Sequence, residues 1–311
     1  MNHLANKATT PRRPLAVSLL LGISGWVAGC FMLMVVGLLF RPDSASQAAF
    51  SGVFLLGAAW GLFKADSDGT HVFVAQLALA LSIAGQCLVL FAMAKDAHGI
   101  APISGAALLL QSVLALVMPN RLHRTLSTFF ALIAWALTVR FALFGEPVDW
   151  YHRATPHGAS LPAALAGWML VWVPVAALLW SAIRSEASWA GRSWAPALSS
   201  IITGLIGGLA FATLASHPFE SFRWFGGQAA GVDYLALWPL LSALGALGAL
   251  TAAFELRQRG LMAMCVVAAL LHISHFYYTL GASLLIKSLL MVTMGAVCLV
   301  GAHSLRAKEP A

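Results

Sequence analysis

Ten long apolar stretches constrain the fold of this 311-residue chain more than any other feature. They run over residues 15–40, 46–63, 72–94, 99–118, 125–144, 160–183, 195–215, 233–254, 260–280 and 283–302. A helix of roughly 20 apolar residues crosses a bilayer core of about 30 Å. The stretches also lack the alternation of polar and apolar residues that marks barrel strands. We therefore predict an all-α, polytopic transmembrane helix bundle of about ten spans.

The composition supports the same fold class. Hydrophobic residues make up 60% of the chain and charged residues 9%, against about 25% charged residues in an average soluble domain. This excludes disorder and most soluble folds. The segments between the stretches are too short for a soluble domain. The sequence predicts one transmembrane domain over 15–302, with tails over 1–14 and 303–311.

The basic residues predict the orientation of the chain. With the N-terminus in the cytoplasm, twelve of the 18 Lys and Arg residues fall on the cytoplasmic side and four on the opposite side. The remaining two, Arg140 and Lys287, lie inside spans. Because Lys and Arg accumulate on the cytoplasmic side, we expect both tails to be cytoplasmic. The basic residues do not gather into a stripe, so we expect the lipid bilayer, and no nucleic acid, as a partner.

Cysteine spacing and sequence motifs offer no catalytic or metal site. The four cysteines are not spaced like zinc or redox ligands, and the sequence contains no HExxH, GxSxG or Walker motif. We therefore assign no catalytic residue, metal or cofactor. Val27–Cys30 resembles a lipoprotein cleavage box, but the apolar run continues to Phe40, which favours an uncleaved first span over lipidation at Cys30.

Ionisable side chains inside spans are costly and are often functional. With the predicted orientation, the outer half of the membrane contains five candidates: Arg140, Asp233, His275, Tyr278 and Lys287. His272 lies close to the midplane on the same side of its helix as His275. We hypothesise that the fifth, eighth, ninth and tenth spans build a polar cavity that opens to the periplasm.

Two simpler interpretations stay open for these residues. The long basic side chains of Arg140 and Lys287 can extend to the interface. The histidines can hydrogen-bond neighbouring helices, while a metal site would need a third ligand that the sequence does not place nearby.

Two outer loops, 145–159 and 216–232, are rich in aromatic and charged residues. They form either an aromatic belt at the level of the lipid headgroups or a docking surface for a partner. The candidate docking residues are Trp150, Tyr151, Glu220, Arg223 and Trp224.

Glycine pairs at four-residue spacing recur within the spans. Gly25 and Gly29, Gly57 and Gly61, and Gly204 and Gly208 fit this pattern. Small residues at this spacing let helix backbones approach closely inside a membrane. The pairs therefore indicate tight helix packing without naming the helices involved.

Several segments carry a family resemblance. Residues 276–280 read FYYTL and residues 284–290 read LLIKSLL. Residues 22–26 (GISGW), 75–80 (AQLALA) and 254–256 (FEL) fit the same pattern. Together they resemble the bacterial domain-of-unknown-function 4401 family over roughly 15–305.

This resemblance implies a multi-pass protein of the bacterial inner membrane. It also implies gene neighbours of two kinds, which are multi-pass proteins of the domain-of-unknown-function 2157 family and membrane-anchored proteins of the GDYXXLXY type. It supplies no activity, but it draws attention to Tyr277, Tyr278, Lys287 and Ser288.

Three functions are compatible with the sequence. The first is a non-enzymatic subunit of an envelope membrane complex, with other multi-pass proteins of the same gene cluster as candidate partners. The second is a ten-span solute transporter of the drug/metabolite type, built from two inverted five-span halves. The third is a membrane enzyme that acts on lipid or envelope precursors and uses His272 and His275.

Overall fold

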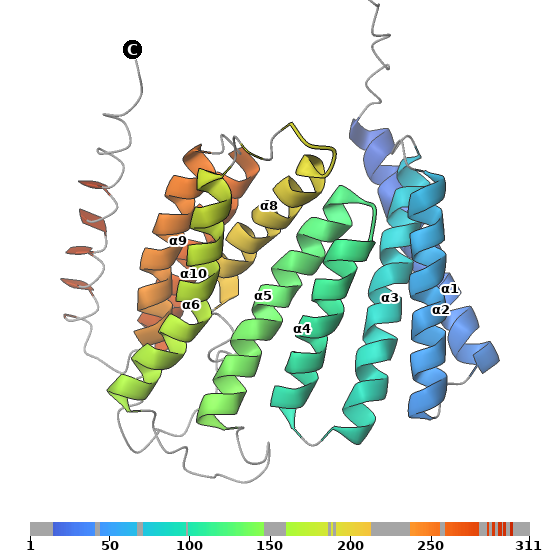
Figure 1. The fold of residues 1–311 in the computed structure, drawn as a ribbon, viewed down its shortest axis with the longest axis horizontal. Helices are drawn as coiled ribbons and strands as arrows, with labels where there is room; N and C mark the ends of the chain where they lie inside the picture. The colour runs from blue at the N-terminus through green and yellow to red at the C-terminus, as the bar shows by residue number, and fades with distance from the viewer. Residues whose placement is uncertain are drawn as a thin grey trace, which may run out of the picture. The chain divides into compact units, whose positions relative to one another are not determined.

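The computed structural model describes residues 15–40, 44–66, 71–97, 99–145, 160–185, 188, 191–212, 237–255 and 259–279, with isolated residues between 285 and 300. The long elements in this part are α1 (Leu15–Phe40), α2 (Ala45–Ala65), α3 (Val72–Asp96), α4 (Ile100–Val117), α5 (Arg121–Phe144), α6 (Leu161–Arg184), α8 (Ala195–Phe211), α9 (Leu237–Glu255) and α10 (Arg259–Thr279) (Figure 1). The all-α class is thus confirmed for the described part of the chain.

Six of these helices are long and apolar enough to cross a membrane: α2, α3, α4, α5, α6 and α10. Shorter apolar helical segments lie within α1, α8 and α9. The tenth predicted span, 283–302, falls mostly outside the described residues. A count of ten spans and the sidedness of both tails therefore stay predictions.

Local sequence explains where several helices begin and end. The Ser44 hydroxyl accepts a hydrogen bond from the backbone N–H of Gln47 at 3.2 Å, and Oε1 of Gln47 accepts one from the backbone N–H of Ser44 at 3.3 Å. These two bonds form a capping box at the start of α2. Gly99 (φ 114°) precedes α4, and Gly145 (φ 71°) follows α5. Both glycines have backbone angles that other residues rarely adopt.

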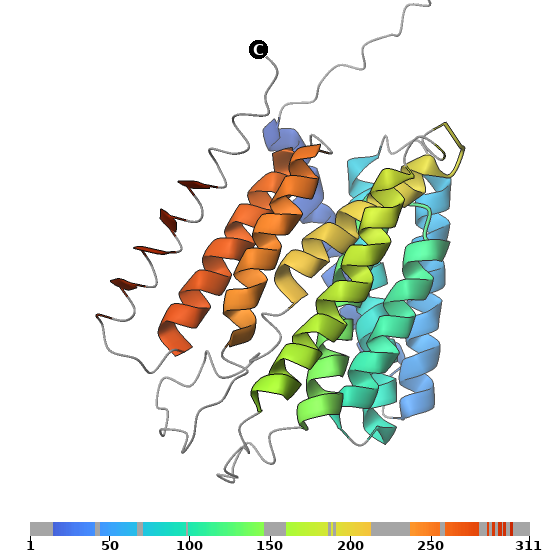
Figure 2. The same cartoon turned by 60° about the vertical axis from the view of Figure 1, so that its left-hand side comes forward.

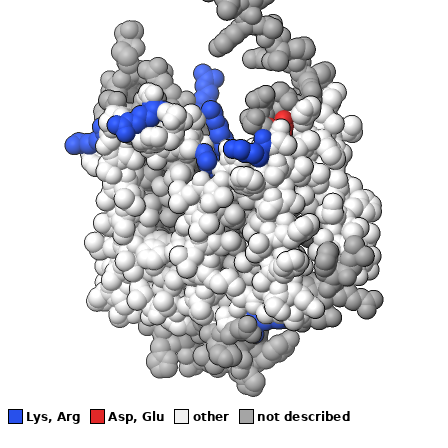
Figure 3. Space-filling view, turned by 45° about the vertical axis from the view of Figure 1, so that its right-hand side comes forward, with Lys and Arg blue, Asp and Glu red and all other residues white. Residues whose placement is uncertain are grey.

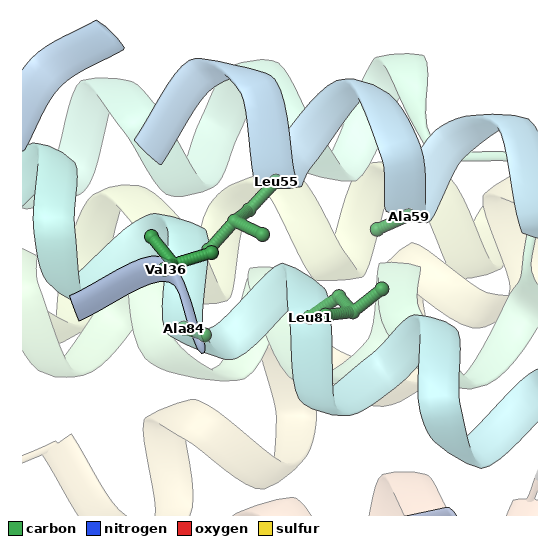
Figure 4. Close-up of a cluster of buried hydrophobic side chains, with 5 residues drawn as sticks. All are labelled: Val36, Leu55, Ala59, Leu81 and Ala84. Atoms are coloured by element: carbon green, nitrogen blue, oxygen red, sulfur yellow. The ribbon is translucent and has the colours of Figure 1, made fainter. Parts of the chain in front are cut away.

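The chain divides into two compact units. Unit 1 contains Met1–Thr138 and Ser185–Leu205, and unit 2 contains Val139–Arg184 and Ile206–Ala311. In unit 1, helices α1, α2 and α4 all pack against α3. Figure 4 shows one resulting core cluster, in which Val36 of α1 lies near Leu55 of α2 and Ala84 of α3, and Ala59 of α2 faces Leu81 of α3 further along the same helices.

Glycines set the closeness of the α2–α3 crossing in unit 1. A Cβ atom on Gly52 would lie 2.8 Å from the Gly85 carbonyl oxygen, and one on Gly85 would lie 2.7 Å from the Gly52 carbonyl oxygen. On α1, Gly25 and Gly29 meet Gln76 and Ala80 of α3 in the same way. These contacts are the close backbone approaches that small residues permit in membranes.

Unit 2 is organised around tryptophans between α6 and α9. Trp168 stacks on Trp172 with ring centroids 5.4 Å apart, and its Nε1 donates to Ser242 Oγ at 3.1 Å. The Nε1 of Trp238 donates to the Ala164 carbonyl at 2.8 Å. Helix α10 packs along α9, as Figures 1 and 2 both show.

Most of the charged residues in the described part of the chain lie at helix ends, and Arg140 lies within α5. Lys64, Arg121, Arg184 and Arg259 lie in the first or last turn of their helices. The lateral surface drawn in Figure 3 is almost free of Lys, Arg, Asp and Glu where it is described. It exposes large hydrophobic side chains instead, including Phe50, Leu109, Leu116 and Leu178. An apolar lateral surface between charged ends suits a lipid bilayer.

Candidate functional site

Arg140, the first residue of the hypothesised cavity, lies four residues before the end of α5. Its Nη1 donates to the Gly145 carbonyl at 3.3 Å. Its guanidinium also lies 5.6 Å from the ring centroids of both Phe141 and Phe144. These three contacts lie at the C-terminal end of α5.

His272 is fully buried and joins α10 to α8. Its Nε2 lies 2.8 Å from the carbonyl oxygen of Ala210. A carbonyl can only accept, so Nε2 carries the proton. Nδ1 of the same ring is buried and has no hydrogen-bond partner among the described residues. His275 lies one turn further along α10 and is partly buried.

The remaining predicted cavity residues are not brought together in the described structure. Asp233, Lys287 and the side chain of Tyr278 lie outside the described residues. Tyr277 is partly buried in α10, and the exposed Ser288 donates to the Leu285 carbonyl at 2.9 Å. The cavity, and the transporter and enzyme functions that depend on it, stay predictions.

The candidate docking loops fall almost entirely outside the described residues as well. Their proposed contact residues lie outside the described part of the chain: Trp150, Tyr151, Glu220, Arg223 and Trp224.

The most extensive polar site that the structure describes centres on His123, which the sequence did not single out as a functional residue. His123 is the third residue of α5 and is 1% exposed. Its Nε2 lies 2.6 Å from Ser82 Oγ of α3, and its Nδ1 lies 3.1 Å from Ser127 Oγ one turn along α5. The Phe63 ring and the imidazole form a T-shaped contact, with centroids 5.7 Å apart.

Two glutamines extend this network to a third helix. Gln86 of α3 donates from Nε2 to Ser82 Oγ at 3.1 Å. Gln111 of α4 donates from Nε2 to Gln86 Oε1 at 2.6 Å. The Oε1 of Gln111 is buried without a hydrogen-bond partner in the described part of the chain. We call these five side chains, Ser82, Gln86, Gln111, His123 and Ser127, the histidine network.

The histidine network gives both ring nitrogens of a neutral His123 imidazole a hydrogen-bond partner. A serine hydroxyl can donate or accept, so either neutral tautomer of His123 keeps a bond at both ring nitrogens. Asn120 anchors the same turn, because its Oδ1 accepts from the His123 backbone amide at 3.0 Å. The network therefore links three helices of unit 1 through hydrogen bonds.

The Ser82–His123 pair also has the spacing of a nucleophile and its general base. However, Ser82 is 0% exposed and lies in the interior of α3, where the backbone amides are used by the helix. Its hydroxyl is already shared between His123 and Gln86. This geometry is that of an interhelical link, and it offers a substrate no approach.

The sequence does contain a signal for the histidine network. Ser82 and Gln86, and likewise His123 and Ser127, are four residues apart and so lie on one helix face. His123 lies between Arg121 and Arg124 at the start of a span, so in the sequence it resembles part of a charged helix end.

The fold and its uncharged lateral surface define an all-α, multi-pass membrane protein. The chain belongs to the family described as Domain of unknown function (DUF4401), whose model matches residues 14–307. This match confirms the resemblance noted in the sequence. Comparisons with curated proteins and with solved structures give no match.

Proposed function

We propose that the protein is a non-enzymatic subunit of a membrane complex, and that a transmembrane helix of its partner docks on the outward face of α2. This face is formed by Phe50, Val53, Phe54, Gly57, Trp60 and Gly61, which are all exposed. They recur at three- and four-residue spacing and so form one continuous stripe along the helix.

The observation that carries the proposal is the contrast between glycine pairs. Helix α3 occupies the space beside Gly25 and Gly29, and Gly52 packs against Gly85. A Cβ atom on Gly57 or Gly61 would have no described atom within 4 Å beyond the helix's own backbone. Glycine destabilises a helix by about 1 kcal/mol relative to alanine. Contact between glycine and lipid does not offset this loss of stability. A partner helix that approaches closely would recover this cost through packing.

The polar interior supports a structural role as well. Interhelical hydrogen bonds join Trp26 to Gln76 at 3.1 Å and Thr138 to Ser104 at 3.0 Å. The histidine network and the bond from His272 to Ala210 do the same at deeply buried positions. These polar groups are engaged in holding helices together, which is the usual role of such groups in membranes.

Site-specific photocrosslinking tests the proposal. A photoreactive side chain at Val53, expressed at the native level, should form an adduct with one discrete membrane protein. The same side chain at Leu116, which is 71% exposed on α4, is the matched control and should react with lipid. Introducing Gly57→Leu into the Val53-labelled chain should abolish the protein adduct, because the leucine fills the space for the partner backbone.

Lipid adducts alone at Val53 would contradict the proposal. An adduct that survives Gly57→Leu unchanged would contradict it too, and an adduct with a second copy of this chain would identify the interface as a homo-oligomeric one instead.

A further inference from the structure

The N-terminal ends of α5 and α8 lie side by side in unit 1. Thr125 Oγ1 of α5 donates to the Ser200 carbonyl of α8 at 3.2 Å. One turn further along both helices, a Cβ on Gly204 would meet Thr128. Both contacts advance in the same direction, so the two helices are parallel. Their first residues, Arg121 and Ala195, therefore lie at the same end.

This register gathers three arginines at that end. Arg121 opens α5, Arg124 follows one turn later, and Arg192 lies three residues before α8. The guanidinium of Arg192 lies 5.7 Å from the ring centroid of Trp194. The Nε of Arg124 is buried and has no hydrogen-bond partner among the described residues. No carboxylate among the residues that the structure describes forms an ion pair with any of these three arginines.

A buried guanidinium N–H without a partner is unfavourable, and the planar guanidinium fork matches the oxygen atoms of a phosphate group. The aligned dipoles of two parallel helices add partial positive charge at the same end. Apolar surface adjoins the cations, because Leu122 and Trp194 are both exposed. Cations beside exposed apolar surface fit an amphiphile better than a free ion.

We propose that Arg121, Arg124 and Arg192 bind the phosphate of an anionic phospholipid. The acyl chains of this lipid lie against the apolar surface next to α5 and α8. The site is independent of the partner-docking face on α2.

Native mass spectrometry of the purified full chain tests this site. The chain is titrated with phosphatidylglycerol, with phosphatidylcholine and, separately, with inorganic phosphate. The wild type should retain one phosphatidylglycerol at concentrations where phosphatidylcholine is lost. Each arginine removed should weaken this binding about fivefold, so Arg121→Gln/Arg124→Gln should weaken it roughly 25-fold.

Arg184→Gln is the matched control. Arg184 also lies at a helix end beside a tryptophan, 4.4 Å from the Trp180 centroid, but at the C-terminus of α6. This variant should keep the bound lipid. If the glutamine pair does not fold, Arg124→Lys serves instead, and its loss of the planar fork should still weaken binding several-fold.

Three results would overturn the site. They are equal retention of phosphatidylglycerol by the wild type and the arginine variants, equal loss in Arg184→Gln, and displacement of the lipid by inorganic phosphate at millimolar concentration. The last result would assign the arginines to a free phosphate.

Discussion

At the scale of residues, His123 illustrates how a polar side chain stabilises a protein in lipid. Its two ring nitrogens are bonded to hydroxyls on α3 and α5, and Gln86 carries the network on to α4. Two individual residues in the spans were recognised in the sequence for their polarity, His272 and Arg140, and both make hydrogen bonds to backbone carbonyls. The prediction that His272 and Arg140 line one cavity also involves Asp233, Tyr278 and Lys287, whose side chains lie outside the described residues.

Replacing His123 by alanine should destabilise the protein by about 2 kcal/mol, because the Ser82 and Ser127 hydroxyls lose their buried partner. The measurement is the apparent unfolding midpoint of the purified protein in detergent. Leu122→Ala is the control, since Leu122 is exposed on the same turn, and it should shift the midpoint little. An equal shift in the two variants would show that the histidine network contributes no specific stability.

At the scale of elements, hydropathy predicted the helices well because lipid demands long apolar segments. The predicted and observed bounds of the first helix coincide at 15–40. The fifth helix begins at Arg121, four residues before its predicted start. The prediction stopped at the charged and polar residues, whereas the helix continues through them to an Asn120 cap.

Which helices pack together could not be predicted from glycine spacing alone. Gly25 and Gly29 face α3, whereas Gly57 and Gly61, with the same spacing, face outward. The spacing specifies a flat helix face, but the fold decides whether a neighbour within the same chain covers it. Gly85 of α3 packs against Gly52 of α2. Neither glycine has a second glycine four residues away in its own helix, so glycine spacing does not mark this contact.

Two alanine substitutions distinguish a glycine packed against a neighbouring helix from a glycine that faces outward. Gly85→Ala should destabilise unit 1 by about 1–3 kcal/mol, because the new methyl group overlaps the Gly52 carbonyl. Gly57→Ala should be neutral or stabilising by up to about 1 kcal/mol, since the position is open and alanine favours the helix. Unfolding midpoints of the two variants, measured without a partner, check this order. The reverse order would contradict the described α2–α3 crossing.

At the scale of the whole molecule, the distribution of charge separates two roles for the basic residues. In the described part of the chain most of them lie at helix ends, where they can determine orientation, Arg140 lies within α5, and the surface between the ends is largely apolar. The sequence predicted this distribution from the positions of Lys and Arg alone. Which side of the membrane each end faces is a separate prediction.

Reporter fusions test the orientation. A reporter that is active only in the cytoplasm should be active when fused after residue 311 or in the segment 185–194, and inactive in the segment 146–159. The reason is that twelve of the 18 basic residues fall on the predicted cytoplasmic side. Activity at residue 311 without activity in the 185–194 segment would contradict ten spans with both tails inside.

The partner-docking face on α2 is tested most directly by the composition of the purified protein. The wild-type chain, extracted from native membranes in mild detergent, should carry one membrane partner at fixed stoichiometry in native mass spectrometry. Gly57→Leu/Gly61→Leu should release this partner without lowering the unfolding midpoint of the isolated chain, because no neighbouring helix among the described residues contacts either position. A wild-type chain that purifies alone, or a double variant that keeps the partner, would contradict a role as a complex subunit.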